Sequence, residues 1–153
     1  MRIHHTVQDS IVDGPGLRFV VFTQGCTHAC AGCHNPQTHD ITGGTEIAVA
    51  EIIAKMNKNP LSDGLTLTGG EPFLQIEDCS TLAKAAKENG LNVWCYTGYT
   101  LEQLREMPSA KKLLDEIDVL VDGKFIQEQK SLSLKWRGSE NQRIIDLKTG
   151  ELL

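Results

Sequence analysis

The sequence predicts an α/β fold, an open or partial (β/α) barrel built on a mostly parallel sheet. Apolar runs typical of buried strands alternate along the chain with helical segments, which is the pattern of βαβ units. Polar, glycine-containing loops follow the strands. The 153 residues suit one domain over residues 1–153, and they are too few for a closed eight-stranded barrel, which typically takes about 250.

Two strands and a helix are predicted in the first half of the chain. Residues 1–16 are polar and rich in turn formers, so we expect them to lead into a first strand over residues 17–23. Apolar residues at i, i+3, i+4 and i+7 over residues 49–56 predict a helix, which Pro60 ends. The alternation of leucine and threonine over residues 65–68 predicts a second strand.

The second half continues this alternation. A helical face over residues 79–86 ends near Gly90, and β-forming residues over 91–97 predict a third strand. Thr100 and Gln103 form a capping box that begins a short helix. The remaining predicted elements are a helix over residues 110–116 and strands over residues 117–121 and 143–147.

A parallel sheet predicts where the functional loops gather. Ligands of parallel α/β folds bind beyond the carboxyl ends of the strands. Four polar loops follow predicted strands directly, at residues 26–33, 69–72, 97–99 and 122–124. We therefore expect these four loops to meet on one face of the molecule.

The loop after the first strand carries three of the five cysteines. Cys26, Cys30 and Cys33 form a Cys-x3-Cys-x2-Cys array. Three thiolates on one short loop can hold a soft metal centre, and three is one fewer than the four ligands that close a structural zinc site or an all-cysteine cluster. A [4Fe-4S] cluster held by this array keeps one iron open to a substrate or cofactor.

Zinc is the alternative that the spacing leaves open, because His28, His34 or His39 would complete a Cys3His site. Disulfides are not expected, because the cysteine count is odd and the chain starts without a secretory leader. These features indicate a reducing, cytoplasmic setting. Cys79 falls on an apolar helix face and Cys95 within a strand, so we expect both to pack as core residues.

The composition argues against two classes of partner. The net charge of −5 gives no global basic field that would attract nucleic acid or an anionic membrane. No apolar run approaches the roughly 20 residues that a membrane span requires.

Gly69-Gly70-Glu71-Pro72 follows the second predicted strand. Two glycines allow the backbone to approach a ligand closely, and Glu71 would offer a carboxylate to a ligand ammonium group. The same four residues are equally typical of a turn before a helix. Arg18 interrupts the first predicted strand, and periodicity places it on a wet face or at the mouth of the strand.

Together these motifs resemble the radical S-adenosylmethionine superfamily. The Cys26–Cys33 array after one strand and Gly69–Pro72 after the next carry the resemblance. Asp13-Gly14-Pro15-Gly16 with Arg18 is similar to the glycyl-radical-enzyme activases, and closest to the activating proteins of anaerobic (class III) ribonucleoside-triphosphate reductases. The supporting stretches are residues 94–99, 119–125, 136–139 and 141–143. The resemblance implies a truncated barrel of the radical-SAM type.

The resemblance implies an oxidoreductase that uses one [4Fe-4S] cluster and S-adenosyl-L-methionine. The three cysteines would hold three irons, and the fourth iron would chelate the cofactor's amino and carboxylate groups. Gly32 stands where many members have an aromatic residue, so the adenine is expected on the backbone of residues 32–34. The other residues implied at the cofactor are Cys33, His34, Gly69, Gly70, Glu71, Arg18 and Asp122, with a solvated rim as the alternative for the last two.

The implied reaction is reductive cleavage of the cofactor to a 5′-deoxyadenosyl radical. That radical would form a glycyl radical on the large subunit of the anaerobic ribonucleoside-triphosphate reductase, with a flavodoxin-like protein as electron donor. One alternative is an activase of another glycyl-radical enzyme, such as pyruvate formate-lyase. The alternative of another class is a zinc-binding interaction module. Arg137 and Arg143 lie in the late polar stretches without an assigned role.

Overall fold

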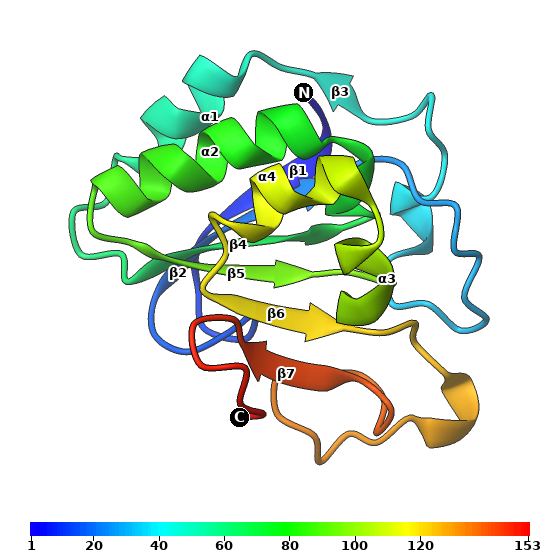
Figure 1. Cartoon of the computed structure of the whole chain (residues 1–153). Helices are drawn as coiled ribbons and strands as arrows, with labels where there is room; N and C mark the ends of the chain where they lie inside the picture. Colours follow the sequence, from blue (N-terminus) through cyan, green and yellow to red (C-terminus); the bar gives the residue numbers. More distant parts are fainter.

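The computed structural model describes residues 1–153 and contains one seven-stranded sheet in the order β3-β1-β2-β4-β5-β6-β7 (Figure 1). Strands β2, β4, β5 and β6 are parallel, whereas β1, β3 and β7 pair antiparallel with their neighbours. The predicted α/β class with a mostly parallel sheet is confirmed. The strands are β1 (Arg2–Ser10), β2 (Arg18–Thr23), β3 (Thr45–Glu46), β4 (Gly64–Gly69), β5 (Asn92–Tyr96), β6 (Val119–Asp122) and β7 (Arg143–Asp146).

The helices lie where the 3.6-residue periodicity and the capping signals predicted them. Thr100 caps α3 through its side chain, and Gln103 completes the predicted capping box. In Figure 1, α1, α2 and α4 lie in front of the sheet. The α-helices are α1 (Val49–Met56), α2 (Ile76–Glu88), α3 (Leu101–Arg105) and α4 (Lys111–Leu114). Short 3-10 turns are η1 (Pro36–Thr38), η2 (Pro72–Leu74), η3 (Pro108–Ala110) and η4 (Gln127–Gln129).

The main core fills the space between the sheet and these helices. Alternate strand residues such as Phe19, Leu65 and Leu120 face the helices and are fully buried. Ile52 of α1 and Leu82 of α2 pack against them from the helical layer. Cys79 and Cys95 belong to this core, as the sequence predicted.

The opposite face of the sheet is covered as well, which corrects the prediction for Arg18. Trp94, Val121 and Ile144 form a second buried cluster there, against which Trp136 packs. Arg18 points into this face and is completely buried, not wet. The prediction was wrong because periodicity along one strand does not reveal which distant residues cover a face of the sheet.

The amino-terminal strand β1 is a second correction. Residues 1–16 are predicted only as a polar, turn-rich segment, but Arg2–Ser10 pair antiparallel with β2, for example Thr6 with Val21. Backbone hydrogen bonds make this strand, while His4 and His5 remain exposed. Because its side chains are polar and partly exposed, this strand is not predicted from the sequence.

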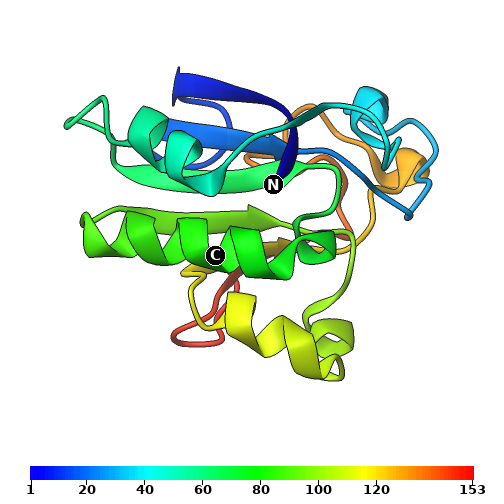
Figure 2. The same ribbon diagram turned by 90° about the horizontal axis from the view of Figure 1, so that it is seen from above.

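The loops after the parallel strands extend beyond one end of the sheet. In Figures 1 and 2, residues 25–40 and 124–130 both lie on the side toward which the arrows of the parallel strands β4, β5 and β6 point. None of the helices has the length and apolar character needed to cross a membrane.

Candidate functional site

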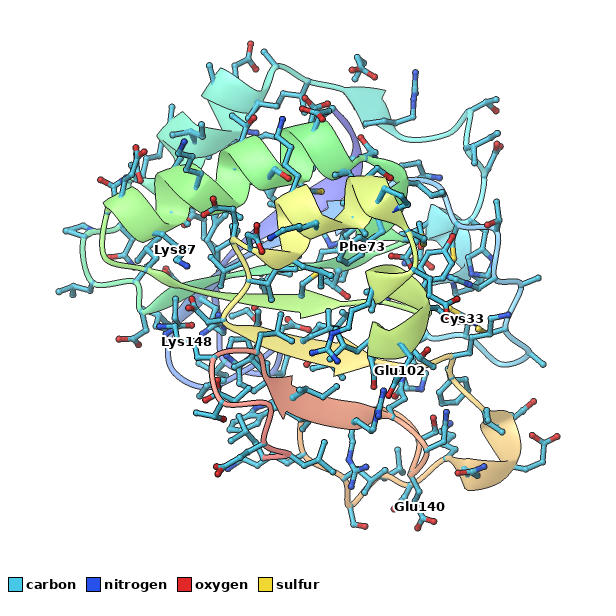
Figure 3. All side chains as sticks on the ribbon, in the orientation of Figure 1. Cys33, Phe73, Lys87, Glu102, Glu140 and Lys148 are labelled. Atoms are coloured by element: carbon cyan, nitrogen blue, oxygen red, sulfur yellow. The ribbon has the colours of Figure 1, made fainter.

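One pocket of about 360 Å³ lies beyond the carboxyl ends of the parallel strands. The predicted convergence of the four loops is confirmed, because all four contribute to its lining. Figure 3 shows Cys33 at this end of the molecule and Lys148 toward the opposite end. The loops after β2, β4, β5 and β6 contribute Cys26, His28, Cys30, Cys33, Gly69, Gly70, Thr97, Gly98 and Gly123.

Residues 124–142 and the turn after β1 supply the other walls of the pocket. Trp136 lines it with a positive φ of 62°, an unusual conformation for a bulky residue. The Tyr96 hydroxyl donates to the Trp136 carbonyl at 2.7 Å and so holds this backbone in place. Arg137 donates from Nη1 to the carbonyls of Glu140 and Gln142, at 3.0 and 2.6 Å.

The cysteine loop needs special backbone conformations at three positions. Gly25, Ala29 and Gly32 have positive φ values of 111°, 53° and 71°. Glycine adopts such angles readily, whereas Ala29 does so at a cost. The base of the loop is closed where the Gly25 amide donates to the Thr38 carbonyl at 2.7 Å. The sequence after β2 therefore turns tightly enough to carry all three cysteines to one pocket.

The three cysteines have the donor chemistry of an iron–sulfur site. Cys26, Cys30 and Cys33 are free thiols, partly exposed and around one pocket. No three His, Cys, Asp or Glu side chains converge closely enough to hold one metal ion. A single zinc needs its thiolates within about 2.3 Å of one point, whereas a [4Fe-4S] cluster takes one thiolate on each of several irons. Three free thiols around one pocket supply the thiolate ligands that such a cluster uses.

The protonation of Cys26 reflects its surroundings. Burial raises the pKa of the Cys26 thiol above its ordinary value, and the nearby Glu71 carboxylate raises this pKa further. A backbone hydrogen bond from His28 acts in the opposite direction. Without a metal, the thiol is therefore favoured over the thiolate at this position.

The two glycines of the 69–72 segment are required by close packing. A Cβ on Gly69 would lie 2.5 Å from the Thr23 amide nitrogen, and one on Gly70 would lie 2.3 Å from the Gly25 carbonyl oxygen. The amides of Gly70 and Glu71 donate to the carbonyls of Thr23 and Gly25, each at 2.8 Å. These bonds extend the pairing of β2 with β4 beyond the strands and bring the segment against the cysteine loop.

Glu71 lies behind the pocket wall at the meeting point of three loops. Its carboxylate is 1% exposed and accepts from the Thr97 hydroxyl at 2.9 and 3.0 Å and from the Gly98 amide at 2.8 Å. The Phe73 amide donates to it at 3.0 Å, and His28 Nε2 lies 2.6 Å from Oε1. The carboxylate therefore has donors from the β4, β5 and cysteine loops.

The residues predicted around the adenine lie close to the late loop. His34 lines the pocket, and its ring centroid is 4.9 Å from that of Phe125. Gly138 packs against the same two rings, since a Cβ there would be 3.0 Å from Phe125 and 3.2 Å from His34. Gly32 faces the Gln127 side chain instead of the pocket lining.

Arg18 and Asp122 are not brought to the pocket lining. Arg18 donates to Thr66 Oγ1 at 2.7 Å and to the carbonyls of Leu65 and Pro15 at 2.9 Å each. Burial lowers the pKa of the Arg18 guanidinium to about 10.

Asp122 is 1% exposed. It accepts from the Leu101 amide at 2.7 Å and from Arg143 Nε at 3.0 Å. The hydrogen bonds that Arg143 donates to Asp122 and then to Glu102 raise the pKa of Arg143. The side chains of Arg18 and Asp122 are thus engaged within the protein.

Sequence reasoning missed the roles of His28 and Thr97. The sequence indicates His28 only as a metal ligand, whereas in the structure it pairs with Glu71. Thr97 ends a predicted strand as a polar residue, and that position was the available signal for a site residue. The partner of neither residue could be read from spacing, because both contacts join segments more than 20 residues apart.

Three thiols at one pocket of an α/β fold are the donor set of an iron–sulfur protein, and comparison with known proteins defines the class. Residues 12–145 match the family described as a 4Fe-4S single cluster domain. The solved structure of QueE from Escherichia coli shares the fold, with a TM-score of 0.53 at 19% identity over 65% of this chain and 53% of that chain.

Curated relatives define the family more narrowly. An anaerobic ribonucleoside-triphosphate reductase-activating protein of Vibrio cholerae is 40% identical over 152 residues, 94% of this chain and 97% of the relative. The proteins of that name from Salmonella typhimurium and enterobacteria phage T4 are each 37% identical, over 97% and 87% of this chain and 100% and 86% of their own. The chain belongs to the family of anaerobic ribonucleoside-triphosphate reductase-activating proteins.

Membership in this family confirms the resemblance drawn from the sequence. The chain is a radical S-adenosylmethionine enzyme of the activase type, and its cofactors are one [4Fe-4S] cluster and S-adenosyl-L-methionine. The three free cysteines around one pocket fit the first of these cofactors.

Proposed function

We propose that this chain activates an anaerobic ribonucleoside-triphosphate reductase by generating a glycyl radical on its large subunit. One observation carries the proposal: three relatives named for this activity, from Vibrio cholerae, Salmonella typhimurium and Escherichia coli, match 94% of the chain or more, at up to 40% identity and with 97% or more of their own length covered. We further propose that residues 1–153 act as one activase domain, which the single sheet supports.

When bound, the cluster and S-adenosyl-L-methionine supply an electron and a 5′-deoxyadenosyl radical that removes a hydrogen atom from the partner's glycine. The chain's own part is binding and orientation. We assign the cluster to Cys26, Cys30 and Cys33, one thiolate to each of three irons. Their placement on one loop around the pocket supports this assignment.

The methionine end of the cofactor is assigned to the segment after β4. Gly69 and Gly70 line the pocket without side chains, which allows a ligand to approach their backbone. The Glu71 carboxylate lies directly behind them and attracts an ammonium group. The adenine is assigned to the backbone of Cys33 and His34, which line the pocket, with Phe125 beside the His34 ring. Gly32, which faces Gln127, is proposed to contribute only by allowing the turn that presents these two residues.

Arg18 and Asp122 contribute indirectly in this proposal. Arg18 holds the 13–16 turn through the Pro15 carbonyl, and Thr66 binds the Asp13 carbonyl of the same turn at 2.8 Å. Asp122 holds the start of α3 through the Leu101 amide. Both side chains then set the shape of the pocket entrance without touching the cofactor.

The pocket entrance is suited to a partner's peptide loop. Val12, Leu134 and Trp136 line the pocket and offer apolar surface beside its polar residues. Backbone of the partner that enters between them would displace water from the site and shield a radical from side reactions.

We propose a flavodoxin-like electron donor and a cytoplasmic location. The three cysteines of the site are partly exposed, so a donor can approach the cluster. All five cysteines are free thiols, which supports a reducing compartment.

The test is an anaerobic activation assay. Protein with a reconstituted, reduced cluster is mixed with S-adenosyl-L-methionine and either the anaerobic reductase or pyruvate formate-lyase. A glycyl radical signal in electron paramagnetic resonance on the reductase alone is expected. A signal on the other enzyme alone would redirect the proposal, and colourless protein with one zinc and no radical would reject it.

A further inference from the structure

We propose that His28 is a positioning residue that locks the cysteine loop against Glu71 and so sets the cysteines relative to the cofactor's binding segment. The inference rests on the proposed function for its meaning in catalysis. The contact itself is a feature of the metal-free chain and can be tested there. His28 here acts on Glu71 and not on a metal.

The first argument is the geometry of the pair. His28 Nε2 lies 2.6 Å from Glu71 Oε1, and the two side chains are 7% and 1% exposed. A carboxylate only accepts hydrogen bonds, so Nε2 carries the shared hydrogen. A hydrogen bond to a charged group away from water is among the stronger contacts in a protein.

The second argument is that the His28 imidazole is closely packed by neighbouring residues. The Tyr99 ring meets the His28 ring edge to face, with centroids 4.6 Å apart. Gly98 lies against the other side, since a Cβ there would be 2.4 Å from His28 Cδ2. Any side chain at position 98 would push the ring away from Glu71. The loop after β5 thus fixes the ring while Glu71 holds its nitrogen.

The third argument is that the cysteine loop has few other attachments. The backbone amides of residues 27–32 donate no hydrogen bond to another backbone group, and those of Gly25 and Cys26 fix only the base. The His28 side chain makes the one side-chain hydrogen bond from residues 27–32 to the rest of the protein. Ala29, next to it, has the costly positive φ of 53°. Besides the packing of Gly32 on the Gln127 side chain, the tip of the loop therefore depends on the His28 hydrogen bond for its position.

The fourth argument concerns Glu71. Its Oε1 is shared between His28, Thr97 and Gly98, so one oxygen connects the cysteine loop to the loop after β5. Removal of the His28 donor leaves Glu71 held by the β4 and β5 loops only. The cysteine loop would then move independently of the Gly69–Glu71 segment, although no other residue of either segment has changed.

The first experiment uses the metal-free, reduced protein. We compare alkylation rates of each cysteine by mass spectrometry in the wild type, His28→Leu, His28→Gln and the exposed control His4→Phe. Leucine fills the space of the imidazole but has no hydrogen-bond donor, whereas glutamine restores a donor. We expect Cys26 to react about tenfold faster in His28→Leu, the effect of losing one charged hydrogen bond. His28→Gln should recover most of the protection, and buried Cys79 should report that all variants are folded.

The second experiment uses protein with a reconstituted cluster. We expect His28→Leu to keep a full cluster by iron and sulfide content but to bind S-adenosyl-L-methionine about tenfold more weakly. The binding is followed by the change that the cofactor makes in the electron paramagnetic resonance signal of the reduced cluster. His28→Gln should bind nearly as the wild type does, and His4→Phe should be unchanged.

Three results would overturn the inference. These are equal Cys26 alkylation in wild type and His28→Leu, equal cofactor affinity in the two, or loss of the cluster in both His28 variants, which would make His28 a metal ligand. Failure of the wild type to bind S-adenosyl-L-methionine would instead reject the proposed function. The alkylation rates would then decide the role of His28 by themselves.

Discussion

Gly70 and Gly25 touch so closely that a Cβ on Gly70 would lie 2.3 Å from the Gly25 carbonyl oxygen. This contact joins the segment after β4 to the start of the cysteine loop, and no side chain fits between them. Gly70→Ala must therefore separate the two segments. We expect it to lower the free energy of unfolding by about 1–3 kcal/mol. It should also weaken cofactor binding, measured by titration of the reduced cluster.

Gly90→Ala is the matched control for this substitution. Gly90 has open space where a Cβ would be, but its φ is 77°. Alanine there costs roughly 1 kcal/mol of backbone strain and touches nothing in the pocket. Cofactor affinity should stay at the wild-type value. Equal loss of affinity in both variants would show that the Gly70–Gly25 contact has no special role.

Local sequence signals predicted most of the fold because each depends on neighbours in the chain. The spacing of apolar residues in α1 and the alternation of leucine and threonine in β4 reflect which sides of that one element are buried. β1 is not predicted by such signals because its pairing uses backbone hydrogen-bonding groups, which every sequence contains. The burial of Arg18 is not predicted either, because the residues that cover its side chain come from distant turns and from β4 and β5.

The residues of the site likewise fall into those that local motifs predict and those that only the fold brings together. The cysteine spacing and the glycine pair could be read directly, and topology alone placed their loops together. The pairing of His28 with Glu71 spans 43 residues and has no local signature. Asp122 likewise reads as a polar strand end, and only the fold shows that Arg143 and Leu101 engage it.

The three site cysteines should be individually essential. Cys26→Ala, Cys30→Ala or Cys33→Ala each leaves one iron without its thiolate, so we expect loss of the cluster and of reductive cleavage of S-adenosyl-L-methionine. Iron and sulfide content and formation of 5′-deoxyadenosine measure the two effects. Full turnover by any of the three variants would contradict the assignment.

The buried cysteines provide the contrasting pair. Cys79→Ala and Cys95→Ala remove small apolar groups from the core and should cost on the order of 1 kcal/mol of stability each, with activity retained. Thermal unfolding with a parallel cleavage assay measures both quantities. A well-folded but inactive variant would place that cysteine in the functional site after all.

Thiol reactivity should follow the order of burial in the folded, metal-free protein. Burial raises the pKa of Cys79 and Cys95 far above that of a free thiol, and it raises that of Cys26 as well. Because only the thiolate reacts, raised pKa values mean little reaction at pH 8 and more as the pH rises. We expect Cys79 and Cys95 to stay unlabelled with iodoacetamide until the protein unfolds. Rapid labelling of either under native conditions would show that the core opens around it.

The Arg143–Asp122 pair should matter for stability more than the neighbouring pair of Arg143 with Glu102. Asp122 is 1% exposed, and Arg143→Met leaves its carboxylate with the Leu101 amide as the remaining donor. Breaking a buried ion pair from one side is costly, and the partial exposure of Arg143 reduces that cost to roughly 1–3 kcal/mol.

Glu102→Gln is the control, since this exposed carboxylate contacts the same guanidinium and can be lost with little effect. Urea unfolding of the two variants and of Arg143→Met/Asp122→Asn distinguishes the contributions. The double variant should recover part of the stability, because it removes the unpaired buried charge together with its partner. If Arg143→Met and Glu102→Gln unfold at the same urea concentration, then solvent rather than Arg143 balances the Asp122 charge.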